Sequence, residues 1–348
     1  MSAIPKHLRL LIVRLGAMGD ILHSMPAVTA LRQAHPEWII GWAIEPQWRG
    51  LFCANGCEPR TATMPLVDRI HIVPAKQWAR SPLSPATLRD IRRVRSELRA
   101  MEYDIAVEFQ GAIRAAMVAR WARTRRIIGE AKPRELPARW FFDEKVPTRG
   151  VHVIEQSLEV ANAIFGENLP MPLPLLPRDP AAEAKAAELP QPFALLSPGA
   201  GWGAKRWPAD RYGDVARRLA EAGYAVMINV GPAEEHLGRE IVESSGGAAR
   251  MLVLNMAELI AVTRRAALAI AGDTGPLHLA SALGRRVVGI YGPTDPARNG
   301  PFHCPNRVLR HPESVRDHAR RSEPEAGLLT ITPEAVTEAA LELLREVR

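Results

Sequence analysis

The 348-residue sequence is 47% hydrophobic and 24% charged, with a net charge of +7. This length exceeds one ordinary core and favours two domains, and the composition excludes a disordered chain. No uncharged apolar stretch reaches the roughly 18 residues that span a bilayer, and the apolar run near the amino terminus is interpreted as a buried strand rather than a signal peptide.

The first half alternates short apolar runs with helical patterns. Because each run is short and continuously apolar, we predict parallel strands at residues 8–16, 39–44, 69–73 and 104–108. The helix after the first strand is predicted to begin near Ser24, since Pro26 is not expected inside a helix. This prediction leaves Asp20 in a loop at the edge of the sheet.

A proline-rich segment, residues 168–180, separates the two halves and is predicted to run extended. The second half repeats the pattern, with strands predicted at residues 193–197, 225–230, 268–271 and 286–291. Thr332 and Pro333 predict the start of a final helix over 333–347. The alternation predicts an α/β protein with two Rossmann-like, doubly wound parallel sheets whose ligand loops face a central cleft.

The charge is uneven along the chain. Residues 1–175 contain 24 Lys and Arg against 17 Asp and Glu, whereas residues 176–348 contain 21 of each kind. A basic half joined to a neutral half predicts an anionic partner for the first domain, such as nucleic acid, an anionic membrane surface or a phosphorylated substrate. For the basic run at residues 89–99, a solvated helix face is an equally good interpretation.

The three cysteines are Cys53, Cys57 and Cys304. Their small and odd number predicts a reducing compartment without a disulfide framework. Cys53 and Cys57 have no matching second pair for a metal site, so we interpret them as small loop or core residues.

The loop after the first predicted strand contains Gly16, Gly19, Asp20 and His23. A carboxylate at this position, close to the positive end of a helix, can accept a proton from a substrate hydroxyl as a general base. It can equally be an acid that only stabilises the helix dipole. The residues of this loop alone leave both interpretations open.

Two loops of the second half have weaker signals. The loop at residues 197–208 has three glycines in five residues, and Lys205 can place a cation on a phosphate. It is not a Walker A loop, because no Ser or Thr follows the lysine. The loop at residues 231–235 places an acid after a strand, where it binds ribose hydroxyls in dinucleotide folds or simply begins a solvated helix.

The most specific loop spans residues 272–278. Thr274 is predicted to cap the following helix, Pro276 suits its first turn and Gly284 is predicted to end it. The free amides of such a helix start can bind a diphosphate. Asp273 and His278 flank this point and can hold sugar hydroxyls or phosphate.

Together these loops resemble glycosyltransferase family 9, the ADP-heptose:lipopolysaccharide heptosyltransferases. The resemblance covers nearly the whole chain and is carried by the motifs LGAMGDILHSMPA, FQG, AKRWP, GDTGPLHLASALG and YGPTDP, in this order. It implies a GT-B architecture. The implied parts are an acceptor domain at 1–167, a linker at 168–180, a nucleotide-sugar domain at 181–332 and a helix at 333–348 that packs back on the first domain.

The resemblance also implies the reaction. A heptose would pass, with inversion, from ADP-L-glycero-D-manno-heptose to Kdo-lipid A or heptosyl-Kdo-lipid A, at the cytoplasmic face of the inner membrane. Asp20 would be the base, and Lys205 would offset the charge of departing ADP. The implied donor-binding residues are Gly203, Lys205, Glu234, Met256, Asp273, Thr274, Gly275 and His278. The implied acceptor-binding residues are Gly19, His23, Lys76, Arg80, Gln110, Arg114 and Arg134.

Neither a metal nor a cofactor is expected. The sequence contains no Asp-x-Asp, so a metal held by that motif is not available, and the ADP-sugar is a substrate. The expected partners are therefore the ADP-sugar, an anionic lipid-linked glycan and an anionic membrane surface, and not nucleic acid.

Several alternatives remain beside this interpretation. An NAD-dependent oxidoreductase needs Gly-x-Gly-x-x-Gly, of which the first loop offers only Gly16 and Gly19. In a nucleic-acid-binding protein we would expect aromatic residues among the basic ones, and residues 89–99 contain none. A family member without catalysis is disfavoured by Asp20 and Lys205. Another nucleotide sugar or glycan acceptor stays open, because the 197–203 loop has more glycines than is usual in the family.

Overall fold

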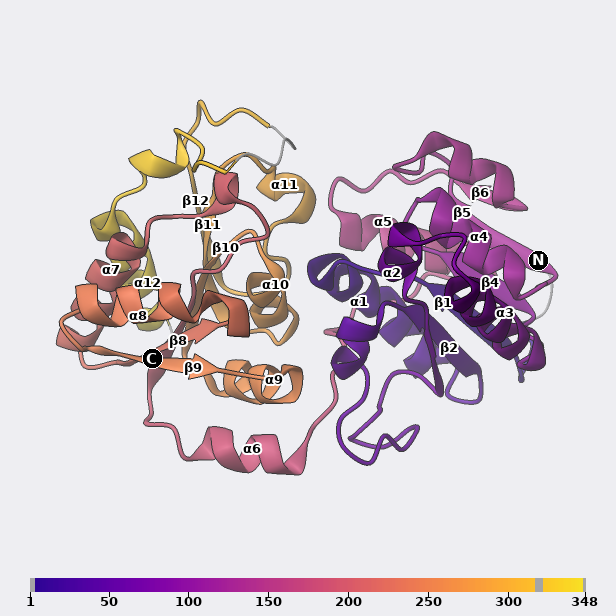
Figure 1. Ribbon diagram of the computed structural model, residues 1–348, viewed down its shortest axis with the longest axis horizontal. Helices are drawn as coiled ribbons and strands as arrows, with labels where there is room; N and C mark the ends of the chain where they lie inside the picture. Colours follow the sequence, from indigo (N-terminus) through magenta and orange to yellow (C-terminus); the bar gives the residue numbers. More distant parts are fainter. Residues whose placement is uncertain (1–3, 317–321, 347–348) are drawn as a thin grey trace. The chain divides into compact units, whose positions relative to one another are not determined.

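The computed structural model describes residues 4–316 and 322–346. The chain forms two compact units, Met1–Pro177 and Arg178–Arg348, called unit 1 and unit 2 below. Each unit is built on one six-stranded parallel sheet with helices connecting its strands (Figure 1). Two doubly wound α/β units of this kind agree with the fold class, GT-B, predicted from the sequence.

Unit 1 has the strand order β3-β2-β1-β4-β5-β6, and every neighbouring pair is parallel. Its strands are β1 (Arg9–Val13), β2 (Ile39–Ile44), β3 (Arg69–Ile72), β4 (Ile105–Glu108), β5 (Arg126–Glu130) and β6 (Glu144–Val146). Its helices are α1 (Met18–Ala34), α2 (Ala75–Arg80), α3 (Pro85–Ala100), α4 (Ile113–Trp121) and α5 (Val153–Asn162). The chain order reverses beside β1, so the loops after β1 and β4 meet at the edge where such folds bind ligands.

Helix α1 begins six residues earlier than the sequence predicts and contains Pro26. The prediction of a loop around Asp20 is therefore wrong. A proline in a helix interior removes one hydrogen bond, here to the carbonyl of Leu22, and costs about 3 kcal/mol. The helix is buried along most of its length and packs against α5, and this burial offsets the missing bond.

Unit 2 has the strand order β12-β11-β10-β7-β8-β9, again all parallel. Its strands are β7 (Phe193–Ser197), β8 (Ala225–Val230), β9 (Ala249–Val253), β10 (Leu268–Gly272), β11 (Arg286–Tyr291) and β12 (Asn306–Arg310). Its helices are α6 (Pro180–Ala187), α7 (Ala209–Glu221), α8 (Glu235–Ser244), α9 (Met256–Arg265), α10 (Gly275–Ala282), α11 (Pro296–Asn299) and α12 (Pro333–Arg345).

Both faces of the unit 2 sheet are buried, as β7 illustrates. Ala194 and Leu196 belong to the apolar cluster that includes α7, α8 and α12. Phe193 and Leu195 point to the opposite face and pack with α6 and α9. Because successive side chains of a strand alternate between faces, a strand covered on both sides must be apolar throughout. This is the continuous apolar pattern on which the strand prediction rested.

The final helix, α12, uses its apolar face within unit 2. Val336, Ala340 and Leu343 are fully buried in the same cluster as α7 and the sheet, and Thr332 caps the helix by accepting a hydrogen bond from the Ala335 amide. The sequence interpretation had this helix packing back on the first domain. The apolar stripe of α12 is covered within unit 2, and its packing on the first domain stays a prediction. The predicted end at Val347 lies outside the described residues.

Four strands were not predicted: β5, β6, β9 and β12. Three of them, β6, β9 and β12, lie at sheet edges, where one side is not covered by a neighbouring strand. Charged residues interrupt all four, as in Glu144-Lys145-Val146 and Asn306-Arg307-Val308-Leu309-Arg310. A strand that is only partly buried needs no continuous apolar run, so the pattern on which we relied is absent.

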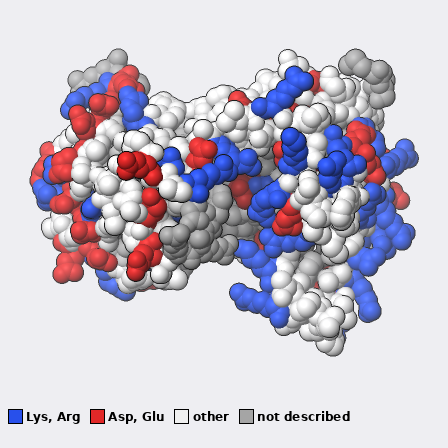
Figure 2. Space-filling view, turned by 90° about the horizontal axis from the view of Figure 1, so that it is seen from above, with Lys and Arg blue, Asp and Glu red and all other residues white. Residues whose placement is uncertain are grey.

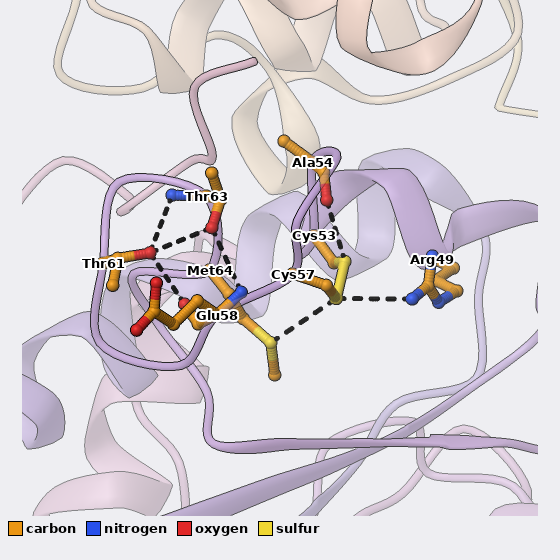
Figure 3. The surroundings of a disulfide bond; sticks show 8 residues. All are labelled: Arg49, Cys53, Ala54, Cys57, Glu58, Thr61, Thr63 and Met64. Carbon is orange, nitrogen blue, oxygen red and sulfur yellow. Dashed lines mark hydrogen bonds between the residues drawn. A yellow bond between two sulfur atoms is a disulfide. The ribbon is translucent and has the colours of Figure 1, made fainter. Parts of the chain in front are cut away.

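Cys53 and Cys57 form a disulfide in a loop between β2 and β3 (Figure 3). Their Cα atoms are 5.1 Å apart, within the range that a disulfide requires. Both are loop residues, as predicted, but the prediction did not include a bond between them. The prediction was based on the number of cysteines, which does not show that the loop turns back between them. Gly56 and Cys57 both have positive φ in this turn.

Among the helices that the structure describes, none is both long and apolar enough to cross a bilayer.

Candidate active site

The predicted base, Asp20, lies in the first turn of α1. Its Oδ2 accepts a hydrogen bond from the Ala17 amide at 3.2 Å, and its Oδ1 lies 3.0 Å from Nη2 of Arg14. The carboxylate side chain is still 44% exposed. Each carboxylate oxygen has two acceptor positions, so the group can still take a proton from a substrate hydroxyl. The residue thus meets the geometry of both interpretations, the helix-terminal acid and the base.

Arg14 ties this carboxylate to the loop after β4. It follows β1, and its Nη1 donates to the carbonyl of Phe109. Next to Phe109, the buried Glu108 accepts hydrogen bonds from the amides of Gln110 and Gly111. Burial raises the pKa of Glu108 to about 7, against the lowering by these amides and by Arg14. Neither Arg14 nor Glu108 is among the site residues predicted from the sequence.

The predicted acceptor residues Gly19, His23 and Gln110 surround the same loops. Gly19 lies in the first turn of α1, one residue before Asp20. His23 is buried one turn further along, with its ring 5.5 Å from that of His152. Gln110 is also buried, and its Oε1 accepts the Leu15 amide at 2.8 Å. Gln110 therefore joins the loops after β1 and β4.

The predicted acceptor cations, Lys76, Arg80, Arg114 and Arg134, are all exposed. Glu135 draws the loops of Arg114 and Arg134 together: its Oε2 accepts the Ile113 amide at 2.9 Å, and its own amide donates to the Gly111 carbonyl at 2.7 Å. Gly111 has φ +62°, and a Cβ there would lie 2.7 Å from the Arg134 amide nitrogen. The FQG motif thus needs its glycine for this close approach.

A second buried acid, Glu45, supports Lys76. It follows β2, and its Oε1 accepts the Lys76 amide at 2.9 Å. Burial raises the pKa of Glu45, while Lys76 and Arg114 lower it.

The exposed cations of unit 1 are part of a wider excess of Lys and Arg in the first half of the chain. On the face seen in Figure 2, unit 1 shows many Lys and Arg side chains, whereas both signs of charge are interspersed over unit 2.

In unit 2, three predicted donor residues form one buried ionic cluster. Nζ of Lys205 pairs with Oδ2 of Asp273 and also donates to the Asp273 carbonyl. Nε2 of His278 lies 3.0 Å from Oδ1 of the same carboxylate. Burial alone raises the pKa of Asp273, but His278 and Lys205 outweigh it and hold this pKa well below its usual value. The carboxylate therefore stays ionised at neutral pH.

Two residues that the sequence analysis did not select complete this cluster. Nδ2 of Asn299 donates to Oδ1 of Asp273 at 3.2 Å. Trp202 lies beside Lys205, with Nζ 4.4 Å from the centroid of its ring. The ammonium thus lies between a carboxylate and the face of an aromatic ring, and each of them attracts a cation.

The cluster lies at the start of α10, where Thr274 and Gly275 were predicted to bind the donor. Thr274 occupies the N-cap position, but its Oγ1 donates to the Gly272 carbonyl, so the prediction of a side-chain cap is wrong. Pro276 is in the first turn and Gly284 follows the helix at φ +65°, as predicted. Because the hydroxyl of Thr274 does not accept from the amides of the first turn, these amides can bind an anionic ligand, which a helix start attracts.

The remaining donor residues lie on neighbouring loops of unit 2. A Cβ on Gly203 would overlap the Ser322 carbonyl, so packing alone requires a glycine there. Glu234 ends a short turn after β8, and its carboxylate lies against Gly199 of the glycine-rich loop. Met256 is the first residue of α9. The loops after β7, β8 and β9 thus each bring at least one predicted donor residue to the carboxyl edge of the sheet.

No group of three or more His, Cys, Asp or Glu side chains is arranged to hold a metal ion within residues 4–316 and 322–346. The described side chains instead form two functional sets, one in each unit. Unit 1 has an exposed carboxylate paired with Arg14, together with further exposed cations, and unit 2 has a lysine beside a helix start. The first set can accept a proton and hold anions, and the second can neutralise a leaving phosphate.

The family model for glycosyltransferase family 9 (heptosyltransferase) matches residues 91–327, more than half of the chain. The chain belongs to this family. It is therefore a glycosyltransferase, as the motifs predicted.

Named family members extend the match over most of the chain. Lipopolysaccharide heptosyltransferase 1 of Pseudomonas aeruginosa is 27% identical, covering 85% of this chain and 81% of that protein. Lipooligosaccharide heptosyltransferase 2 of Haemophilus influenzae is 25% identical, covering 97% and 99%. Among solved structures, E. coli heptosyltransferase WaaC with ADP has a TM-score of 0.79 at 24% identity, covering 97% of this chain and 100% of that one. This last likeness supports the fold.

Proposed function

We propose that this glycosyltransferase moves a heptose from ADP-L-glycero-D-manno-heptose to the inner core of lipopolysaccharide, with Kdo-lipid A or heptosyl-Kdo-lipid A as the acceptor. Relatives named heptosyltransferase 1 and 2 both match along the chain at similar identity, which supports the sugar and the class of acceptor. The observation that carries the proposal is the buried cluster of Lys205, Asp273 and His278 at the start of α10.

This cluster suits a nucleoside diphosphate sugar. The positive end of a helix and an adjacent ammonium both favour a diphosphate. Asp273 and His278 offer an acceptor and a donor for sugar hydroxyls beside it. Glu234 and Met256 are assigned to the ribose and the adenine, in agreement with the family motifs. We therefore assign the donor to unit 2.

The acceptor is assigned to unit 1. Its exposed cations, Lys76, Arg80, Arg114 and Arg134, suit the carboxylates and phosphates of an inner-core glycan. The basic excess of the unit also suits the anionic face of a membrane, where such a lipid-linked acceptor lies. We accordingly place the enzyme in the cytoplasm, in peripheral contact with the inner membrane.

The proposed reaction is one displacement. Asp20 takes the proton of the acceptor hydroxyl while the oxygen attacks the anomeric carbon, and ADP leaves from the opposite face, so the configuration inverts. Lys205 and the amides of α10 neutralise the charge that develops on the diphosphate. Gly19 and His23 lie beside the base, and Gln110 fixes the loop next to it.

The test is to incubate the purified protein with a panel of nucleotide sugars and either Kdo-lipid A or heptosyl-Kdo-lipid A, and to weigh the products. We expect a mass gain of one heptose from the ADP-heptose reaction with one of the two acceptors. Transfer of a different sugar would show that the donor is another nucleotide sugar, the alternative given in the sequence analysis. Failure with every donor would contradict the proposal.

Because Lys205 and helix amides are proposed to stabilise the leaving group, EDTA should leave the rate unchanged. The measurement is the initial rate with and without chelator, repeated after adding Mg²⁺ or Mn²⁺. A strict requirement for either ion would overturn this part of the mechanism.

A further inference from the structure

The contacts of Arg14 connect the proposed base to a rigid part of unit 1. Its side chain is only 13% exposed, compared with 44% for Asp20. One end of the guanidinium meets Asp20 Oδ1, and the other donates to the carbonyl of Phe109. The two partners come from the start of α1 and from the loop after β4, which are about ninety residues apart in the sequence.

The position of Arg14 is itself fixed. It follows β1, the strand that lies between β2 and β4 in the sheet. Its carbonyl accepts a hydrogen bond from Nε1 of the buried Trp42, at 3.1 Å, and the Val13 carbonyl accepts the Phe109 amide at 3.1 Å. Both the backbone and the head group of Arg14 are therefore held, which leaves Asp20 facing a cation that cannot easily move.

Glu108 adds a second acid to this arrangement. It is buried, holds the 109–111 loop through its bonds to two amides, and interacts electrostatically with Arg14. A planar guanidinium can serve several acceptors at fixed angles, which a lysine ammonium cannot do with the same geometry. The arginine at this position thus fits a role that demands direction as well as charge.

We infer that Arg14 is a positioning residue for the transfer reaction, which holds the carboxylate of Asp20 in the orientation needed to take the acceptor proton. The inference rests on the proposed function, because it assumes that Asp20 is the base. Arg14 touches neither substrate in this account. It acts through Asp20 by restricting the rotation of a side chain that is otherwise nearly half exposed.

The test is a double-mutant cycle with Arg14→Met and Asp20→Asn, measuring kcat and both KM values with ADP-heptose and its lipid acceptor. Arg14→Met should lower kcat about 10- to 100-fold and leave the KM for the donor unchanged. In the Asp20→Asn background the same change should cost less than about threefold, because there is no longer a base to position. Arg126→Met is the matched control, since Arg126 also forms an ion pair in unit 1, with Glu144. It should alter thermal stability but not kcat.

Two results would separate the inference from the proposed function. If Asp20→Asn alone keeps normal turnover, the base assignment falls and this inference falls with it. If Asp20→Asn is slowed as expected but Arg14→Met costs the same factor with and without Asp20, only the positioning role is overturned. Should Arg14→Met not fold, Arg14→Lys carries the same cycle. It keeps the cation and should lose kcat by about tenfold, again only while Asp20 is present.

Discussion

The two sets of functional residues differ in how they are assembled. In unit 2 the ionic cluster is buried, and two of its members, Asp273 and His278, lie on one turn of chain at the start of α10. In unit 1 the corresponding side chains come from separate strand ends, and the cations are exposed. Burial and local sequence suit a site for one fixed ligand, the nucleotide. An exposed set joined by long-range contacts suits a large, charged acceptor.

The comparison also separates two kinds of electrostatic effect. Buried ion pairs are only weakly screened by salt, whereas exposed charges are screened over about 8–10 Å at ordinary ionic strength. Changes in the unit 2 cluster should therefore have large effects that depend little on salt. Changes among the exposed cations of unit 1 should have small effects that depend strongly on it.

The largest effect is expected at Asp20, the one reactive group that we assign to unit 1. Asp20→Asn keeps the shape of the side chain but cannot take the proton as a carboxylate does. Transfer should fall by roughly 10²–10⁴, with the affinity for ADP little changed. The control is Asp210→Asn, because Asp210 is also an acid in the first turn of a helix, α7. Near-normal turnover of Asp20→Asn would remove Asp20 from the mechanism.

Lys205→Ala should have the next largest effect, and it tests unit 2. Removing the ammonium leaves Asp273 buried without one of its partners and takes a cation from the leaving diphosphate. We expect turnover to fall by about 10²–10³ and ADP to bind more weakly, while the KM for the acceptor stays the same. Lys145→Ala, at an exposed lysine of unit 1, is the control. A rise in acceptor KM without any effect on ADP would reverse our assignment of this residue.

The buried Glu108 should make the stability of unit 1 depend on pH, in contrast to the exposed acids on its surface. Burial raises the pKa of Glu108 to about 7 from its ordinary value of 4.5, so the folded chain holds the proton where the unfolded chain releases it. The stability that the protonated group provides is fully present below pH 4.5 and is lost as the pH rises to about 7. Across this window the wild type should lose about 3 kcal/mol relative to Glu108→Gln.

The measurement for Glu108 is urea unfolding of both proteins at pH 5 and pH 8. Glu102→Gln, at an acid that is 84% exposed, should show no such difference. A wild type and Glu108→Gln that respond alike to pH would mean that Glu108 titrates normally despite its burial.

The smallest effects are expected at the exposed cations. Arg114→Glu or Arg134→Glu should raise the KM for the acceptor by about tenfold, and added salt should raise the wild-type KM in the same direction. Arg89→Glu, at an exposed arginine of α3, is the matched control for a change in total charge. Equal effects of all three reversals would point to a general attraction rather than to defined acceptor contacts.

The sequence predicted the unit 2 set more fully than the unit 1 set, for a physical reason. A glycine, an acid and a histidine that share one strand-to-helix turn can be recognised within seven residues. Arg14, Glu45 and Glu108 follow or end separate strands, which become neighbours only when the sheet forms, so no local pattern marks these residues. Asn299 likewise reaches Asp273 from 26 residues further along the chain, whereas Trp202 lies in the same loop as Lys205 and was not marked by any pattern that we used.

The errors in the prediction have two origins, one tertiary and one local. Pro26 argued locally against a helix, yet burial of α1 against α5 overrode it. The hydroxyl of Thr274 suited a cap, yet it bonds to Gly272 instead. Cys53 and Cys57 lacked a partner pair in the sequence, and the turn of the loop joined them to each other. Only for α1 did a tertiary contact override the local pattern; the Thr274 bond and the disulfide span two and four residues, and the residue types alone do not determine either.

The division of labour between the units is the central claim, and calorimetric binding of ADP tests it most directly. The variants are Lys205→Ala in unit 2 and Asp20→Asn, Arg114→Glu and Arg134→Glu in unit 1, each measured beside the wild type. We predict that the three unit 1 variants bind ADP within about threefold of the wild type, whereas Lys205→Ala binds it at least about tenfold more weakly. Loss of ADP binding in Arg114→Glu or Arg134→Glu, together with normal binding in Lys205→Ala, would contradict the account and assign the donor to the other unit.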